Sequence, residues 1–321
     1  MPVTALHRTS HQIDVAAPAG VVYGLIADAV RWPLFLAPNV HVEPLDLEGS
    51  EQRLRVWTLA NGRVTSWVTR RRLDPCARRI DFRQEMSAPP VESMSGTWSV
   101  EQLPDGSARL TLLHAFSVAG DRAEDVAWVE RARDANTRAQ LANLKELAER
   151  WTVLDDLVLT FEDAVRVNGP AELVYDFLYR AGDWPEVLPH LKRVDLVEDV
   201  SGIQMLSADT VMADGREHTI RSVRVCFPHG GRIVHKLTEP PALIAAHAGE
   251  WSVEPDETGV TVIAQHHVVL REQDIAPVLG EGAGLAAARR YVRHTLGRAS
   301  TTILGLAKRH AESAVRLPLR G

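Results

Sequence analysis

Hydrophobic and polar positions alternate along most of the first half of the chain and predict a run of β-strands. The alternating segments cover residues 40–48, 52–60, 63–73, 79–86, 91–101 and 108–118. A period of two is typical of strands that bury one face, and turn residues such as Pro104-Asp105-Gly106 separate the segments. Apolar residues then recur at helical spacing over residues 124–150. This order predicts an α+β fold in which an antiparallel sheet is followed by a long helix.

A further strand and two short helices are expected before this sheet. Residues 11–17 alternate, and two short apolar helical patterns follow, the second of which holds Trp32 and Phe35. The second half of the chain has the same order, from an alternating segment at residues 158–169 to a helical pattern at residues 280–310. Such a sheet can curl around its long helix and enclose a cavity.

The two halves are copies of one unit. Trp32-Pro33 recurs 152 residues later as Trp184-Pro185, and GTWSVE around Trp98 recurs 153 residues later as GEWSVE around Trp251. A nearly constant offset over about 100 residues indicates two domains of one fold and not a solenoid of short repeats. We expect the domains to cover residues 1–154 and 155–321.

Composition narrows the class of protein. Of 321 residues, 45% are hydrophobic and 24% are charged, as is usual for globular domains. No apolar run approaches the ~18–20 residues that span a bilayer, and no leader pattern is evident, so we expect a cytoplasmic protein without membrane association. The net charge of −6 does not indicate the basic surface that binds nucleic acid. Two cysteines and the lack of metal-ligand spacing or nucleotide-binding motifs predict no metal and no cofactor.

One predicted strand carries an arginine on its cavity side. Because side chains alternate on a strand, Trp67, Thr69 and Arg71 share one face. The second copy repeats the hydroxyl and the arginine as Ser222 and Arg224. A guanidinium is a rigid fork of donors that suits carbonyl or enolate oxygens. The alternative is an arginine that faces solvent, and the recurrence of the pair favours the cavity.

Large side chains of the strands and short helices are candidates for the cavity wall. Flat aromatic faces suit a planar or poly-oxygenated ligand, although most aromatic residues in sheets form ordinary core. Both interpretations stay open. The candidate lining residues are Trp32, Phe35, Trp57, Trp67, Met94 and Trp98 in the first copy and Trp184, His247 and Trp251 in the second.

A histidine recurs in the strand before each long helix, as His114 and His266. Near neutral pH an imidazole can act as a proton shuttle, and the alternative is a hydrogen-bonded core histidine. No nucleophile motif such as G-x-S-x-G is present. Chemistry in such a cavity would depend on orientation and general acid–base catalysis.

These motifs resemble a known family. The predicted fold is similar to the helix-grip arrangement of the START/Bet v 1-like superfamily. Within it, Trp32-Pro33, the strand from Trp67 to Arg71 and the strand from Met94 to Trp98 resemble the aromatase/cyclases of bacterial type II polyketide biosynthesis. The resemblance covers essentially the whole chain, and two fused copies resemble the didomain subclass.

The resemblance implies a substrate and partners. The substrate would be a poly-β-keto chain that is already reduced at C9, and the reaction would be C7–C12 closure and dehydration of the first ring by intramolecular aldol chemistry. The chain would arrive as a thioester on an acyl carrier protein, and the ketosynthase/chain-length factor and the ketoreductase would be further partners.

The resemblance also implies roles for residues. Arg71 would polarise a substrate carbonyl and Thr69 would support it, with the aromatic residues shaping the cavity. The first domain matches the motifs better, so it is expected to carry most of the chemistry. The second domain, with Arg224 and Ser222 as its catalytic candidates, would be a second site, a helper for dehydration or mainly a structural support. Family members often have a tyrosine after the Trp-Pro helix; here Asn39, His41 or water would replace it.

Two other interpretations remain. Helix-grip proteins also bind and transport hydrophobic small molecules without chemistry, and a purely structural partner of a synthase complex is a third class. On the face opposite Arg71, Arg70 and Arg72 would form a basic patch near the rim of the cavity. Such a patch would suit an acidic carrier protein, or it is an ordinary solvated strand face.

Overall fold

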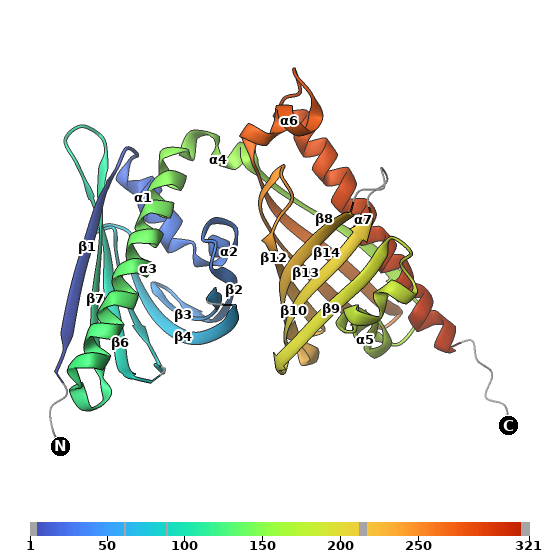
Figure 1. Cartoon of the computed structure of the whole chain (residues 1–321), viewed down its shortest axis with the longest axis horizontal. Helices are drawn as coiled ribbons and strands as arrows, with labels where there is room; N and C mark the ends of the chain where they lie inside the picture. The colour runs from blue at the N-terminus through green and yellow to red at the C-terminus, as the bar shows by residue number, and fades with distance from the viewer. Residues whose placement is uncertain (1–4, 61, 88, 212–216, 316–321) are drawn as a thin grey trace. The chain divides into compact units, whose positions relative to one another are not determined.

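The protein forms two compact units, Met1–Asp155 and Asp156–Gly321. The structure is a computed structural model that describes residues 5–60, 62–87, 89–211 and 217–315. Each unit contains a seven-stranded sheet with a long helix across one face (Figure 1). Within the described ranges, no helix is long and apolar enough to cross a membrane.

The first unit runs from a strand through short helices into the rest of its sheet. Its elements are β1 (His7–Val15), α1 (Ala19–Ala27), η1 (Ala29–Arg31), α2 (Trp32–Phe35), β2 (Asn39–Glu48), β3 (Glu51–Ala60), β4 (Arg63–Asp74), β5 (Arg79–Gln84), β6 (Val91–Gln102), β7 (Ala108–Val118), η2 (Ala119–Asp121) and α3 (Ala123–Glu149). The short helix α4 (Trp151–Leu157) then joins the units.

The second unit repeats this order. Its elements are β8 (Val158–Val167), α5 (Ala171–Tyr179), η3 (Ala181–Glu186), β9 (Leu191–Val200), β10 (Ile203–Val211), β11 (Glu217–Phe227), η4 (Pro228–Gly230), β12 (Arg232–Glu239), β13 (Ile244–Asp256), β14 (Gly259–Leu270), η5 (Glu272–Asp274), α6 (Ile275–Leu279) and α7 (Leu285–Val315). The predicted pair of helix-grip domains is confirmed.

Pattern reasoning located the strands well and one helix start less well. The six strands expected after the Trp-Pro helix are found within two residues of their predicted ends. The last helix was expected from residue 280 and begins at Leu285. Gly280 and Gly282 have φ values of 93° and 84°, which a right-handed helix excludes.

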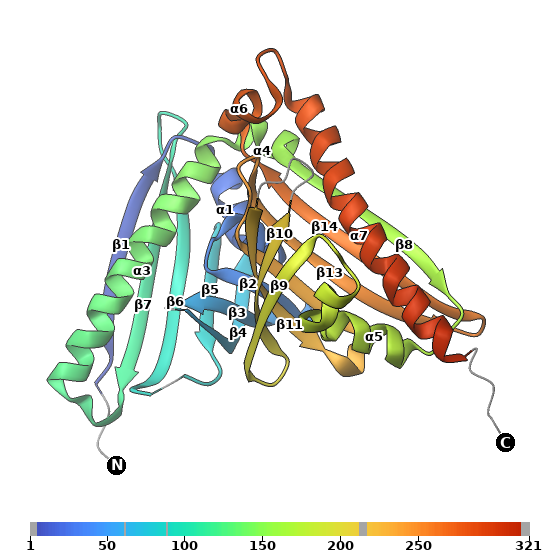
Figure 2. The ribbon, with the colours of Figure 1, turned by 45° about the vertical axis from the view of Figure 1, so that its right-hand side comes forward.

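Both sheets are entirely antiparallel and have the same strand order. That order is β1-β7-β6-β5-β4-β3-β2 in the first unit and β8-β14-β13-β12-β11-β10-β9 in the second. The first strand of each unit therefore pairs with the last, and the long helix packs beside that pair, α3 against β1 and β7 and α7 against β8 and β14 (Figure 2).

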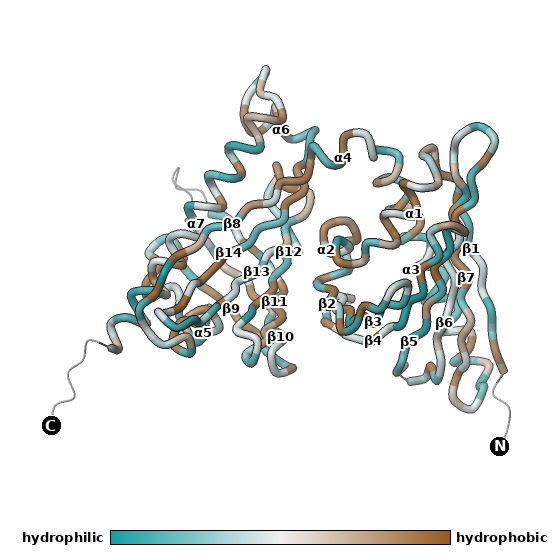
Figure 3. The backbone as a smooth tube through the Cα atoms, turned by 180° about the vertical axis from the view of Figure 1, so that it is seen from behind, coloured by the Kyte–Doolittle hydropathy of each residue, from teal (hydrophilic) through white to brown (hydrophobic). Residues whose placement is uncertain are grey.

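The core of each unit lies between the sheet and its helices. In the first unit Leu141 and Leu144 of α3 pack on a buried cluster that includes Trp98 and Leu110. Helices α1 and α2 are apolar along most of their length, as Figure 3 shows. In the second unit Leu304 of α7 packs in the equivalent cluster. One face of each sheet is thus buried by helices, which fixes the side to which strand residues must turn.

A glycine on the buried face of β6 is required by close packing. A Cβ at Gly96 would lie 2.4 Å from the carbonyl oxygen of Leu113 and 2.5 Å from the ring of Phe82. We expect Gly96→Ala to destabilise the protein by about 1–3 kcal/mol, because overpacking forces backbone shifts. Gly20→Ala in α1 is the matched control, since nothing lies within 4 Å of its Cβ. Equal thermal unfolding midpoints for the two variants would contradict this.

Candidate functional site

A buried arginine joins the sheet of the first unit to the end of α1. Arg71 is 3% exposed, and its Nη2 and Nη1 donate to the carbonyl oxygens of Ile26 and Ala27 at 2.6 and 3.4 Å. Its guanidinium carbon lies 5.0 Å from the ring centre of Trp32. These carbonyls end the helix and carry its negative partial charge, so the cation is placed where it is favoured.

The second unit repeats this contact. Arg224 is equally buried, donates to the carbonyl oxygens of Leu178 and Tyr179 at the end of α5, and lies 5.8 Å from the ring centre of Trp184. Both arginines therefore lie on the buried face of their sheets, as alternation along the strands predicted. Burial lowers the pKa of Arg71 to about 10, so the guanidinium stays charged at neutral pH.

Strand register places each arginine in a row of side chains that crosses the sheet. In the first unit the row is Gln52, Arg71, Phe82, Gly96, His114 and Thr9, each directly opposite the next. In the second unit it is Gln204, Arg224, His235, Gly249, His266 and Phe161. The glycine of each row leaves room for the ring beside it. The rows differ in that the first unit has a phenyl ring next to its arginine and the second has an imidazole.

Three histidines lie together in the second unit. His247 Nε2 is 3.0 Å from His266 Nδ1, and His266 Nε2 is 2.8 Å from the hydroxyl of Ser300 on α7. The ring of His235 meets the ring of His247 edge-on, with 5.5 Å between their centres. Among the described residues, neither His235 Nδ1 nor His247 Nδ1 has a hydrogen-bond partner.

The hydroxyl of Ser300 sets the direction of these hydrogen bonds. It donates its single proton to the carbonyl oxygen of Leu296 at 2.7 Å, so it must accept from His266 Nε2. The Nδ1 of His266 is then unprotonated and accepts from His247 Nε2. His247 therefore holds an unprotonated Nδ1. Burial lowers the pKa of His247 to about 3 and that of His266 to about 4, which keeps both rings neutral.

A cavity of about 200 Å³ opens beside Arg224. Trp184, Ser222, Arg224, His235 and Trp251 are among the residues that line it. Ala299 and Ile303 of α7 line the helix side of this cavity. Tyr291 and Thr295, on the same face of α7, line a second hollow of about 370 Å³. These α7 positions follow one another at intervals of four in the sequence, so the two hollows lie along one stripe of the helix. Of the residues predicted for this domain, His247 and His266 lie behind His235 and are not among those lining the cavity.

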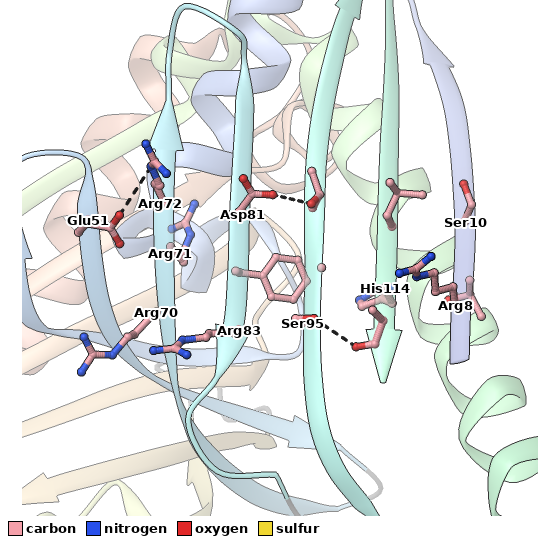
Figure 4. A pocket seen from close by; sticks show the side chains of 16 residues that line it. Arg8, Ser10, Glu51, Arg70, Arg71, Arg72, Asp81, Arg83, Ser95 and His114 are labelled. Atoms are coloured by element: carbon pink, nitrogen blue, oxygen red, sulfur yellow. Dashed lines mark hydrogen bonds and ion pairs between the residues drawn. The ribbon is translucent and has the colours of Figure 1, made fainter. Parts of the chain in front are cut away.

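A different hollow marks the first unit. A groove of about 760 Å³ crosses β4 to β7 and β1, and most of its walls come from positions that alternate with the buried ones. Arg70, Arg72 and Arg83 gather on it, with Glu51 beyond Arg72 at one end, Asp81 beside Arg72 and Arg8 at the other end (Figure 4). The groove therefore lies on the face of the sheet that is turned away from α3. This face carries the predicted basic patch.

The salt bridges of this groove leave a surplus of positive charge. Glu85 is shared by Arg53 and Arg70, with Arg70 Nε at 2.7 Å, and these arginines hold the pKa of Glu85 at about 2. Arg72 is 3.8 Å from Glu51. Within the described part of the chain, the side chains of Arg8 and Arg83 form no hydrogen bond or ion pair.

Several predicted site residues of the first unit have other partners. The hydroxyl of Thr69 donates to the carbonyl oxygen of Arg83 at 3.1 Å. Trp67 packs with Trp32 beside Leu54 and Val56. Trp98 lies in the main core cluster, and Met94 packs in a smaller one with Phe116. Phe35 is buried under the guanidinium of Arg31.

The expectation that Trp57 lines the same cavity as Arg71 is wrong. Trp57 pairs with Ser66, whereas the residues on the face of Arg71 are Leu54 and Val56, so alternation turns Trp57 to the opposite face. There it contacts His41 and Arg55. His41 thus contacts Trp57 and forms a hydrogen bond with Glu43, on the face opposite Arg71.

The sequence reasoning missed three residues. His235 was overlooked because its counterpart Phe82 is apolar, although the 153-residue offset pairs them. Ser300 and Arg133 lie on the long helices, and the motifs that marked candidate residues lie on the strands and short helices. Arg133 lies one turn from buried Val129 and from buried Thr137 on α3, and burial lowers its pKa. Among the described residues it has no hydrogen-bond or ion-pair partner.

The described residues contain no group of three or more His, Cys, Asp or Glu side chains placed to hold a metal ion. In both units a curved antiparallel sheet packs on a long helix with a buried arginine between them, which defines the helix-grip fold, and in the second unit a cavity lies beside that arginine.

Known proteins share this architecture. Residues 7–149 and 158–303 each match the family described as polyketide cyclase/dehydrase and lipid transport. The chain is 40% identical over 317 residues to the granaticin polyketide synthase bifunctional cyclase/dehydratase of Streptomyces violaceoruber, covering 98% of this chain and 96% of the relative. It is 38% identical to the actinorhodin polyketide synthase bifunctional cyclase/dehydratase of Streptomyces coelicolor, covering 96% of each.

Solved structures agree with these relatives. The crystal structure of the di-domain ARO/CYC BexL from the BE-7585A biosynthetic pathway matches with a TM-score of 0.87 and 47% identity, over 95% of this chain and 99% of that one. The di-domain ARO/CYC StfQ from the steffimycin pathway matches with a TM-score of 0.84 and 34% identity, over 96% and 99%. The chain belongs to the polyketide cyclase/dehydrase and lipid transport family, and within it to the two-domain polyketide cyclase/dehydratases.

The buried histidines predict sensitivity to acid. The folded protein keeps His247 and His266 neutral down to pH about 4, whereas the unfolded chain binds protons from about pH 6.5. Stability should therefore fall as the pH drops from 6.5 toward 4. Asp163 opposes this loss at His266, and Arg293 and His267 add to it.

The measurement compares thermal unfolding midpoints at pH 7 and pH 5. His247→Met, which introduces the residue of the first unit, should lose less stability on acidification than the native protein. An equal drop in both proteins would contradict the assignment of a neutral, buried His247.

Proposed function

We propose that the protein closes and dehydrates the first ring of a carrier-bound, C9-reduced poly-β-keto chain, with C7–C12 regiochemistry. The coarser activity, cyclisation and dehydration of polyketides, follows from membership of the family. The observation that supports the finer proposal is the pair of buried arginines, each fixed on a helix end and a tryptophan. Neither forms an ion pair with a carboxylate among the described residues, so the charge is available to a substrate oxygen.

Arg71 would act on a substrate carbonyl. Two of its five donors are used on Ile26 and Ala27, which leaves donors for an oxygen that becomes an enolate during carbon–carbon bond formation. Thr69, on the same face two residues before Arg71, would support the arginine. The aldol step joins a methylene carbon to a ketone carbon and moves one proton, and loss of water then follows. Orientation and charge stabilisation suffice for such a step, without a covalent nucleophile.

We propose further that the first unit carries the ring closure. Each arginine has one carboxylate among the charges that raise its pKa, Asp28 for Arg71 and Glu198 for Arg224. These charges therefore do not separate the two arginines. The support for the first unit is that the motifs of the resembling family match it more closely.

Arginine variants test this assignment. Reconstitution with a minimal synthase, carrier protein and ketoreductase should show that Arg71→Ala lowers first-ring product about 10²–10³-fold, the loss typical of one oxyanion donor. Arg224→Ala should reduce ring closure less. Because Arg71 also holds the end of α1, thermal unfolding of each variant must be recorded, and Arg71→Lys should retain the fold without the forked donors. Equal loss of ring closure at Arg71 and Arg224 would overturn the ranking.

The groove of the first unit is proposed to bind the acidic carrier protein. Its arginines outnumber its carboxylates, and Arg70 and Arg72 are 52% and 73% exposed. Long-range attraction between opposite charges speeds encounter and fixes orientation. The ketosynthase/chain-length factor and the ketoreductase would supply the chain that the carrier brings.

Charge reversal tests the docking surface. Arg70→Glu with Arg72→Glu should raise the KM for carrier-bound substrate at least tenfold at low salt, while turnover of a small thioester analogue is unchanged. Arg138→Glu on the exposed side of α3 is the matched control, since it also breaks a surface ion pair. Unchanged turnover of carrier-bound substrate by the double variant would exclude docking there.

A further inference from the structure

The cavity of the second unit contains a base that its counterpart lacks. His235 stands directly opposite Arg224 on neighbouring strands and on the same face, so their Cβ atoms are about 5 Å apart. Both line the same cavity. The equivalent pair in the first unit is Arg71 and Phe82. Only the second unit therefore sets an imidazole beside the guanidinium.

The surroundings hold the imidazole of His235 in place. Its ring lies over Gly249, where a Cβ would come within 2.6 Å of Cε1, and its other contacts are the rings of His247 and Trp251. A buried nitrogen without a hydrogen bond costs free energy and is rare in native structures. His235 Nδ1 is such an atom on a residue that lines the cavity, and His247 Nδ1 is a second one on the residue behind it.

The hydrogen bonds behind His235 give the cluster a fixed direction. Starting from the carbonyl oxygen of Leu296, each group accepts a hydrogen bond from the next, through Ser300 and His266 to His247. This chain anchors the ring of His247, which meets His235 edge-on. His247 and Ser300 are therefore positioning residues, whereas His235 faces the cavity itself.

We propose that the second unit is a separate acid–base site for the elimination of water, in which His235 is the catalytic base and Arg224 holds the enolate oxygen. This inference rests on the proposed function, because the ring closed by the first reaction is its substrate. The ligand is a β-hydroxy ketone within a six-membered carbocycle.

The elimination balances with one histidine. The imidazole of His235 removes the proton from the carbon between the carbonyl and the carbinol, and the electron pair moves onto the carbonyl oxygen beside Arg224. The enolate then expels the β-hydroxyl, which takes the same proton from the imidazolium. A carbon–carbon double bond forms, one water leaves and His235 is neutral again. No oxidant, reductant or cofactor enters the step.

The chain provides its own conservative variants. His235→Phe and His247→Met introduce the residues found at the equivalent positions of the first unit, Phe82 and Met94. Phe82 packs over Gly96 as His235 packs over Gly249. Both variants are therefore expected to fold. His294→Gln, on the exposed side of α7, is the control for loss of a histidine outside the cluster.

The experiment measures the ratio of dehydrated to hydroxylated first-ring product by mass spectrometry in the reconstituted system. His235→Phe should lower the dehydration rate about 10²–10⁴-fold, the usual contribution of a general base, and the cyclised β-hydroxy ketone should accumulate. The total of cyclised products should be unchanged, because ring closure takes place in the first unit.

His247→Met is expected to lower kcat for dehydration without raising KM. The nitrogen-15 spectrum of the native protein should show His266 protonated at Nε2, and loss of the hydrogen bond from His247 should shift the Nδ1 signal of His266. If the role of His247 is purely structural, kcat for dehydration will stay unchanged in His247→Met although the Nδ1 signal of His266 shifts.

The outcomes separate the two proposals. If the native protein forms no cyclised product, the proposed function fails, whatever happens at His235. If the native protein and His235→Phe give the same ratio of dehydrated to hydroxylated product, the proposed function stands and the acid–base site is refuted. A loss of all cyclised product in His235→Phe, with a native unfolding midpoint, would also refute the separation of the two steps.

Discussion

Each unit depends on one buried contact, in which an arginine of a central strand donates to the last carbonyls of a short helix and lies on a tryptophan face. The helix end needs donors because its carbonyls have no partner within the helix. The arginine needs acceptors because a buried charge without them is unstable. The contact therefore ties the short helices to the sheet, and it leaves a fixed cation on the buried face of each sheet.

The same contact explains why two copies can diverge without losing the fold. The glutamine, the arginine, the glycine and the histidine after it occur in both rows, whereas the ring between arginine and glycine is Phe82 in one unit and His235 in the other. A phenyl and an imidazole both fit over a glycine, so the exchange changes the chemistry beside the cation and leaves the packing alone. Duplication in this way supplies two related rows of buried side chains that differ in the ring beside the arginine.

The positive charge of the first unit is distributed over two faces with different consequences. Arg71 of β4 and Arg133 of α3 lie on the side of the sheet that the long helix covers. Burial lowers the pKa of both, and no carboxylate among the described residues pairs with them. Arg70, Arg72 and Arg83 are on the opposite face, where ion pairs with Glu85 and Glu51 are partial. Because a strand alternates, three consecutive arginines serve both an interior and a surface.

The sequence by itself determined much of this protein. The 152- and 153-residue offsets established two copies, alternation located the six strands after the Trp-Pro helix to within two residues, and alternation also placed Thr69 and Arg71 inside and Arg70 and Arg72 outside. These are local properties, since a period of two needs no knowledge of distant neighbours.

Only the tertiary structure decided which strands face one another, and in what register. Register placed Trp57 on the face opposite Arg71, although both lie on neighbouring strands and both looked like cavity residues. It also brought His235 beside Arg224, and it brought His266 within reach of Ser300, 34 residues away on α7. Pairing between strands follows from the packing of the whole sheet against its helix, and a shift of one residue would turn every side chain to the other face.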